Sequence, residues 1–368
     1  MTIKINYHNM KPYILILTFI LGTSLTMSAQ YKYYDASALP LLGKISPKTE
    51  TLYERLPVAI REQTRKPVWE LGQNSTGLAV RFSSDSPLIS AKWEVSINYS
   101  MVHMTPTGIK GLDLYCWEDS KWVFVNSARP YSNEKIKEAV IIDNMEVKER
   151  EYMLYLPLYD GISSLEIGVD SAYTVSQPKV SVPQTGKPII CYGTSILQGG
   201  CASRPGMAHT SILSRWLNRE FINLGFSGNG QLDYEIAEII AEREASVIIL
   251  DFMPNVNVEQ IREKMIPFYE IIRKKQPDVP IIFIENPIFP HGRFDKYMQT
   301  VVEEKNKELH IFYNILKSRG EKNISLVSSE DMIGHDGEAT VDGIHFTDLG
   351  FMRYAEYLYP YIKEVLYE

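Results

Sequence analysis

The chain has 368 residues, of which 45% are hydrophobic and 23% are charged. This balance is typical of a globular protein, so it excludes a disordered chain and allows two packed domains. The formal net charge of −7 argues against a basic surface for polyanions. We therefore expect no nucleic-acid partner and a neutral or modestly polar substrate.

The first 29 residues have the three-part layout of a secretory signal peptide. Lys4 and Lys11 precede an apolar run over residues 13–22, and small and polar residues follow it up to Ala29. We expect cleavage near Ala29 and export to the periplasm or the extracellular space. An uncleaved anchor is the alternative, although the run is short for a bilayer of about 30 Å. No later run approaches that length, so the mature protein should not insert stably into a membrane.

Neither a metal nor an organic cofactor is expected. Cys116, Cys191 and Cys201 are too few and too irregularly spaced for a disulfide framework or a zinc site, although one pair could still oxidise. The histidines show no His-x-His or His-Glu-x-x-His spacing, which makes a metallo-hydrolase the weaker alternative.

Short alternating strands dominate residues 30–176 and predict a β-sandwich of the jelly-roll kind. Turn formers such as Asp160-Gly161 separate these strands. The clearest predicted strands are 78–82, 88–95, 112–117, 122–125 and 152–156.

The pattern changes after residues 177–187, where two prolines and a glycine, followed directly by Pro188, indicate a linker. In residues 188–368, buried-strand runs alternate with helical patterns, which predicts a parallel sheet with helices on both faces. The predicted strands are 189–192, 247–250, 280–284 and 324–327, and the predicted helices are 211–219, 234–244, 258–275, 295–317 and a terminal amphipathic helix.

Ser195 is the candidate nucleophile. It follows the first buried strand of the second half, in Tyr192-Gly-Thr-Ser195, where Gly193 permits a tight turn at the strand tip. A Gly-x-Ser sequence after a strand is often only a turn, so this assignment needs a base elsewhere in the chain.

His345 is the candidate base, because it lies on a turn-rich segment before the terminal helix, three residues after Asp342. A carboxylate at that distance can accept the ring N–H and fix the tautomer. A helix cap is the alternative role for this segment. His209 and His310 lie in predicted helices, and His103 belongs to the sandwich half.

Backbone and amide donors follow the second and third strands of this half. Gly228 lies in a glycine-rich loop and Asn255 ends the block Asp251-Phe-Met-Pro-Asn255, so both could stabilise an oxyanion together with the Ser195 N–H. The order of these blocks is serine, glycine, asparagine and then Asp-x-x-His.

This series resembles the SGNH (GDSL-like) hydrolase family over residues 187–368. The resemblance implies a flavodoxin-like three-layer α/β fold, a Ser195–His345–Asp342 triad, and an oxyanion hole of Ser195, Gly228 and Asn255. The first block reads Gly-Thr-Ser-Ile instead of Gly-Asp-Ser-Leu, and the third reads Met-Pro-Asn-Val instead of Gly-x-Asn-Asp. These changes remove no reacting group but leave the substrate class open.

Gly111-Leu-Asp-Leu-Tyr115 resembles the signature of the GxDLY domain that precedes some bacterial SGNH domains. Its residues alone indicate a turn and a strand, with a substrate contact as the alternative. Arg204 and His291 are further candidates for substrate binding, with a surface salt bridge as the alternative for Arg204.

The resemblance implies a serine esterase that removes short acyl groups, such as acetate, from carbohydrate through an acyl-enzyme, and the predicted signal peptide implies that this esterase is exported. The alternatives are an acyltransferase, lipase or thioesterase with the same triad, and a catalytically silent glycan-binding protein. The sequence leaves open the acyl length, the alcohol and the oligomeric state.

Overall fold

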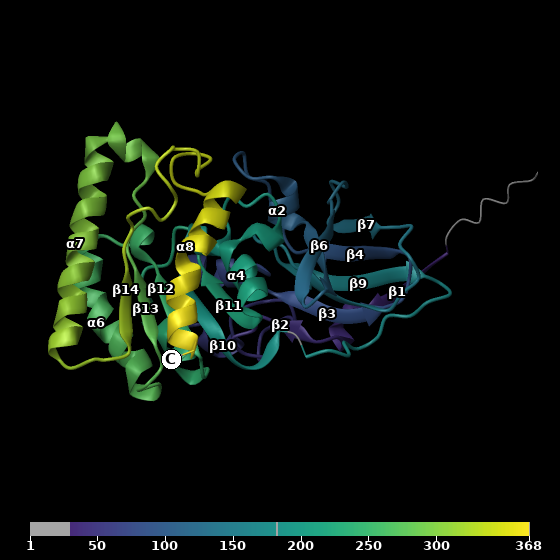
Figure 1. Ribbon diagram of the computed structural model, residues 1–368, viewed down its shortest axis with the longest axis horizontal. Coiled ribbons are helices and arrows are strands. Elements are labelled where there is room, and N and C mark those ends of the chain that lie inside the picture. The colour runs from purple at the N-terminus through teal and green to yellow at the C-terminus, as the bar shows by residue number, and fades with distance from the viewer. Residues whose placement is uncertain (1–29, 182, 368) are drawn as a thin grey trace, which may run out of the picture.

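The computed structural model describes residues 30–181 and 183–367, which form an antiparallel β-sandwich followed by a parallel α/β domain (Figure 1). Both predicted fold classes are confirmed. The predicted signal peptide lies outside the described residues. Within them, no helix combines the length and the hydropathy that a bilayer crossing requires.

The sandwich consists of one four-stranded and one five-stranded sheet, in the orders β1-β9-β4-β7 and β2-β3-β8-β5-β6. Side chains such as Phe82, Trp93 and Tyr152 fill the space between the sheets and are fully buried. The strands are β1 (Tyr31–Asp35), β2 (Leu41–Leu42), β3 (Ala79–Ser84), β4 (Ile89–Val95), β5 (Leu112–Glu118), β6 (Lys121–Ala128), β7 (Ile136–Ile142), β8 (Arg150–Tyr155) and β9 (Ile162–Asp170).

The second half contains a parallel sheet in the order β11-β10-β12-β13-β14. The first strand of this half therefore lies between the second and the third, which is the flavodoxin-like order and opens a crevice at the carboxyl ends. The strands are β10 (Gln184–Gly193), β11 (Arg219–Gly225), β12 (Val247–Asp251), β13 (Ile281–Ile284) and β14 (Ile324–Val327).

Helices cover both faces of this sheet because alternate strand residues are apolar on each side. One face packs against α1 (Lys66–Gly72), α5 (Tyr234–Glu242), α6 (Val258–Lys275) and α7 (Lys296–Ser318). The other face packs against α3 (Ser195–Gln198), α4 (His209–Leu217) and α8 (Asp348–Tyr367). The sandwich half adds the short helix α2 (Pro106–Lys110).

The boundary between the halves differs from the predicted one in two respects. Strand β10 begins at Gln184, inside the predicted linker, because its first residue pairs with Arg219 of β11. In addition, Leu56 and Trp69 precede most of the sandwich but pack in the core of the parallel sheet. These side chains complete the hydrophobic layer on that face of the sheet.

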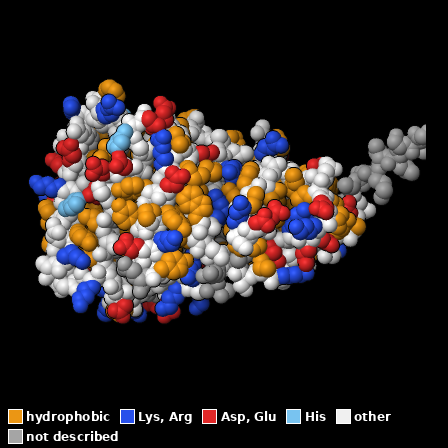
Figure 2. Space-filling view, in the orientation of Figure 1, with side chains coloured by type: hydrophobic (Ala, Val, Ile, Leu, Met, Phe, Trp, Pro, Cys, Tyr) orange, Lys and Arg blue, Asp and Glu red, His pale blue; other side chains and the backbone are white. Residues whose placement is uncertain are grey.

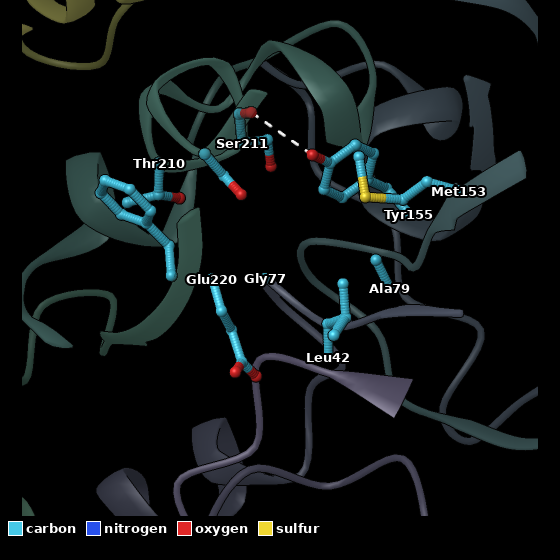
Figure 3. Close-up of a pocket in the computed structure, with 10 residues that line it drawn as sticks. Leu42, Gly77, Ala79, Met153, Tyr155, Thr210, Ser211 and Glu220 are labelled. Atoms are coloured by element: carbon cyan, nitrogen blue, oxygen red, sulfur yellow. Dashed lines mark hydrogen bonds between the residues drawn. The ribbon is translucent and has the colours of Figure 1, made fainter. Parts of the chain in front are cut away.

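The two halves also meet directly between β8 and α4. The Tyr155 hydroxyl donates a hydrogen bond to the Ser211 carbonyl at 3.3 Å, and Leu42 and Glu220 line the same small cavity (Figure 3). Acidic and basic side chains are interspersed over the visible face of both halves (Figure 2).

Candidate active site

Ser195 lies at the carboxyl end of β10, at the first position of α3. The Thr194 hydroxyl caps this short helix by accepting a hydrogen bond from the Ile196 N–H at 3.3 Å. Gly193 is required for close packing, because a Cβ there would collide with the carbonyl oxygen of Asp251 on β12. The strand tip therefore holds Ser195 at the crevice, with 6% of the residue exposed.

The structure brings His345 and Asp342 to this serine. His345 Nε2 lies 2.9 Å from Ser195 Oγ, and His345 Nδ1 lies 2.7 Å from Asp342 Oδ2. The Nδ1–H therefore donates to the carboxylate, which leaves Nε2 free to accept the serine proton. A hydroxyl, an imidazole and a carboxylate in one chain of hydrogen bonds can generate a nucleophile at neutral pH.

Asp342 is held in its ionised form. Burial opposes its ionisation, but the hydrogen bonds from the His345 ring and from the backbone N–H groups of His345 and Ile344 outweigh that effect. Together they lower the pKa of Asp342 to about 2. Asp342 can therefore orient the imidazole and stabilise its protonated form throughout the neutral range.

Gly228 and Asn255 line the same pocket as Ser195 and His345. Gly228 adopts a φ of 68°, a left-handed conformation that favours glycine. Asn255 Oδ1 accepts a hydrogen bond from the Gly230 N–H at 3.2 Å, which ties the two loops together. Within the described residues, the Asn255 Nδ2 group has no protein acceptor, so it is available to an oxyanion.

The pocket has a volume of about 420 Å³, and its lining is partly apolar. That volume is within the usual range for small-molecule sites. The apolar lining residues include Phe289, Met298, Val301, Val302 and Ile344.

The sandwich half contributes residues that the sequence analysis did not identify. The Tyr159 hydroxyl donates to the Ser195 carbonyl at 3.2 Å, and Arg65 binds Asp233 at 2.6 Å and the Asn229 side chain at 3.0 Å. Arg65 thereby anchors the loop that carries Gly228. No local pattern reveals these contacts, because the partners lie far apart in the sequence.

His103 also comes from the sandwich half, and its ring centroid lies 5.5 Å from that of His345. One ligand atom each of His103, Cys201 and His345 lie within 4.8 Å of one another, so this group could hold a metal ion. Both ring nitrogens of His345 already bond Asp342 and Ser195. Metal binding would therefore compete with the triad. All three cysteines are buried free thiols.

Arg204 lies against strand β5 and is not among the residues that line the pocket of Ser195. Its guanidinium bonds Asp113 at 2.7 Å and the Tyr115 hydroxyl at 2.8 Å, and Asp113 also accepts from the Gly206 N–H at 2.9 Å. The pair with the buried Asp113 carboxylate gives Arg204 the salt-bridge role that was its alternative, and a substrate contact of Arg204 stays a prediction. The Gly111–Tyr115 motif thus docks the segment that follows Ser195, in keeping with its structural interpretation.

His291 supports the loop between Asp342 and His345. Its Nδ1 lies 2.8 Å from the Gly343 carbonyl oxygen, and its ring stacks on Phe289. Phe289 lines the pocket, whereas His291 does not. The observed contact of His291 is thus with the loop, through Nδ1, and its substrate contact stays a prediction.

The fold and this geometry define a serine ester hydrolase of the SGNH type. Residues 186–363 match the model of the GDSL-like lipase/acylhydrolase family, and residues 31–175 match that of the GxDLY N-terminus of SGNH-hydrolase-type esterases. A protein from Bacteroides ovatus described as a GDSL-like lipase is 38% identical, with a TM-score of 0.87 over 92% of this chain and 98% of that one. The chain belongs to the GDSL-like lipase/acylhydrolase family.

Two more distant structures share the fold of both halves. The salicylyl-acyltransferase SsfX3 of a tetracycline biosynthetic pathway is 17% identical, with a TM-score of 0.72 over 91% of this chain and 97% of that one. An acetyl xylan esterase from the rumen bacterium Butyrivibrio proteoclasticus is 12% identical, with a TM-score of 0.53 over 92% of this chain and all of that one. The search of curated proteins found no match.

Proposed function

We propose that this protein is an exported esterase that removes short acyl groups, such as acetate, from carbohydrate. The hydrogen bond of 2.9 Å between His345 Nε2 and Ser195 Oγ carries the proposal, because it is the contact through which a serine becomes a nucleophile.

In the proposed reaction, Ser195 Oγ attacks the ester carbonyl carbon while His345 Nε2 takes the serine proton. The carbonyl oxygen becomes an oxyanion, which receives hydrogen bonds from the Ser195 and Gly228 N–H groups and from the Asn255 amide. His345 then gives its proton to the leaving alcohol oxygen, and the acyl group remains on Ser195. A water molecule, deprotonated by His345, releases the acid and restores the serine.

Carbohydrate as the alcohol is supported by the fold shared with the acetyl xylan esterase and by the preceding β-sandwich. A fold shared at this identity is an analogy, so the substrate remains part of the proposal. Export is supported by the basic and apolar layout of residues 1–29. Mass determination of the protein from its native host would test export, with a mature N-terminus near Gln30 as the expected result.

The activity is tested by measuring hydrolysis of 4-nitrophenyl acetate, butyrate and octanoate by the native protein and by Ser195→Ala. We expect the native protein to prefer the shorter chains and Ser195→Ala to lose at least about 10³-fold in kcat. Ser318→Ala, an exposed serine at the end of α7, is the matched control and should keep full activity. Undiminished turnover by Ser195→Ala would overturn the proposal.

The carbohydrate assignment needs a polymer assay. Acetate release from acetylated xylan supports it, and release confined to small aryl esters contradicts it. Addition of a competing alcohol separates hydrolysis from acyl transfer, because transfer produces a new ester instead of free acid.

A further inference from the structure

Lys305 occupies a core-facing position on α7. The buried residues of this helix are Val302, Lys305, Leu309, Phe312 and Leu316, a spacing of three and four residues that defines one helix face. Lys305 is therefore a cation in an otherwise apolar stripe. Only 6% of its surface is exposed, and it lines the pocket that contains Ser195.

Within the described residues, Lys305 has almost no electrostatic compensation. Its one hydrogen bond is a long contact of 3.3 Å from Nζ to the Pro254 carbonyl oxygen, and no carboxylate forms an ion pair with it. Burial lowers its pKa to about 8, so most molecules still carry the charge at neutral pH. A buried cation of this kind is costly unless it meets an acceptor.

A second polar side chain that lines this pocket, that of Asn286, is only partly hydrogen-bonded. Asn286 follows β13 and is 1% exposed, and its Oδ1 has no hydrogen bond within the described residues. Its backbone is held from α7, because the Asn306 amide binds both the N–H and the carbonyl of Asn286, at 2.8 and 3.1 Å. The backbone of Asn286 is thus fixed in place. In its side-chain amide, Nδ2 donates to the Pro287 carbonyl at 2.8 Å and Oδ1 has no hydrogen bond within the described residues.

We propose that Lys305 is the binding group of a subsite for a carboxylate carried by the ester substrate. A carboxylate pairs with the buried ammonium ion of Lys305. It can also accept a hydrogen bond from the Asn286 Nδ2 group, whose other N–H donates to the Pro287 carbonyl at 2.8 Å, whereas Asn286 Oδ1 is itself an acceptor and gains no partner from a carboxylate. The same pocket is also lined by apolar side chains, among them Phe289 and Ile344, which suit the carbon skeleton of such a ligand. This inference rests on the proposed ester hydrolysis at Ser195.

The carboxylate has two chemical sources. It can belong to the acyl group, as in a half-ester of a dicarboxylic acid, or to the alcohol, as in an acetylated acidic sugar. The first source is represented by mono-4-nitrophenyl adipate, with neutral 4-nitrophenyl hexanoate as its match. The second is represented by 4-acetoxybenzoate, with neutral 4-acetoxybenzamide as its match.

The experiment measures kcat/KM for these four esters with the purified native protein and with Lys305→Met. We expect the native protein to prefer the anionic member of one pair by about 10- to 100-fold, the range for a hydrogen bond to a charged group. The pair that shows the preference identifies the source. Lys305→Met should abolish it while leaving the two neutral esters nearly unchanged. Lys307→Met, an exposed lysine on the same helix, should preserve it.

Equal loss on neutral and anionic esters would overturn the inference, because Lys305 would then act only by holding Pro254 beside Asn255. The absence of an anionic preference in the native protein would overturn it as well. If no ester is hydrolysed and Ser195→Ala behaves like the native protein, the proposed function itself fails. Thermal unfolding of Lys305→Met establishes that the variant is folded.

Discussion

The parallel-sheet half places Ser195, Gly228 and Asn255 at the carboxyl ends of its own strands, whereas the sandwich half reaches the site through loops and single side chains. Arg65 and Tyr159 contact the backbone or the supporting loop of the candidate site, not the pocket itself. The comparison indicates that one half supplies the reacting groups and the other holds them in position. Substitutions in the two halves should therefore differ in the size of their effect and in whether they change kcat or stability.

The largest effect is expected in the parallel-sheet half. Asp342→Asn should lower kcat by on the order of 10³–10⁴-fold, because the amide no longer fixes the tautomer of His345 or stabilises its charge. Steady-state kinetics with 4-nitrophenyl acetate measure this loss, and circular dichroism should show an unchanged fold. A loss of less than about tenfold would mean that Asp342 is not the orienting carboxylate.

A smaller kinetic effect is expected from the sandwich half. Arg65→Ala frees Asn229 and Asp233, so the loop that carries Gly228 should move and kcat should fall by about 10- to 100-fold. Arg61→Ala is the control, because its exposed ion pair with Glu50 lies outside that loop and should contribute little. If both variants behave alike, the sandwich half has no positioning role through Arg65.

Substitutions in the Gly111–Tyr115 motif should change the stability of the protein more than its kcat. Asp113→Asn weakens the buried pair with Arg204, and we expect a loss of about 2–3 kcal/mol in the free energy of unfolding. The value of kcat should remain close to that of the native protein. Urea denaturation measures the first quantity, and Glu118→Gln at the exposed end of the same strand is the control. A selective loss of kcat would instead support the substrate-contact interpretation of Gly111–Tyr115.

The smallest effect is a pH dependence of stability. The pKa of Asp342 is lowered to about 2 in the folded protein, so its stabilising contribution is complete above the unfolded pKa of about 3.9. That contribution is lost as the pH falls from about 4 to about 2. The difference in unfolding free energy between the native protein and Asp342→Asn should therefore stay constant from pH 5 to 7 and narrow below pH 4. A difference that narrows around pH 6 would contradict this assignment.

Much of the site could be predicted because its signals are local. Asp342 and His345 are three residues apart, and Ser195 directly follows an apolar strand. The helices α4 to α8 and most strands of the parallel sheet followed from periodicity. These signals need no knowledge of distant contacts.

The sandwich strands β1, β2, β7 and β9 are not among the predicted ones, and for β7 and β9 the reason is physical. In β7, Lys137 is buried while Ile136 and Val140 are exposed, which inverts the usual alternation. In β9, the pairing register with β4 shifts between Glu94 and Val95, so the apolar spacing is irregular. Neither pattern could be recognised without its partner strand.

Contacts between the halves could not be predicted either. His103 lies beside His345 only because the sandwich docks on the parallel-sheet half. Lys305 is a different case, since its position between Val302 and Leu309 on the apolar face can be derived from the helical spacing. A charged residue at such a position was a detectable signal.

The most direct test of the account is to identify the residue that an acyl-like inhibitor modifies. The native protein is treated with a 4-nitrophenyl phosphonate ester, digested, and mapped by mass spectrometry. The account predicts one adduct, on the peptide that contains Ser195, with no adduct in Ser195→Ala and slow labelling in Asp342→Asn. An adduct on another residue, or equal labelling of Ser195→Ala, would contradict it.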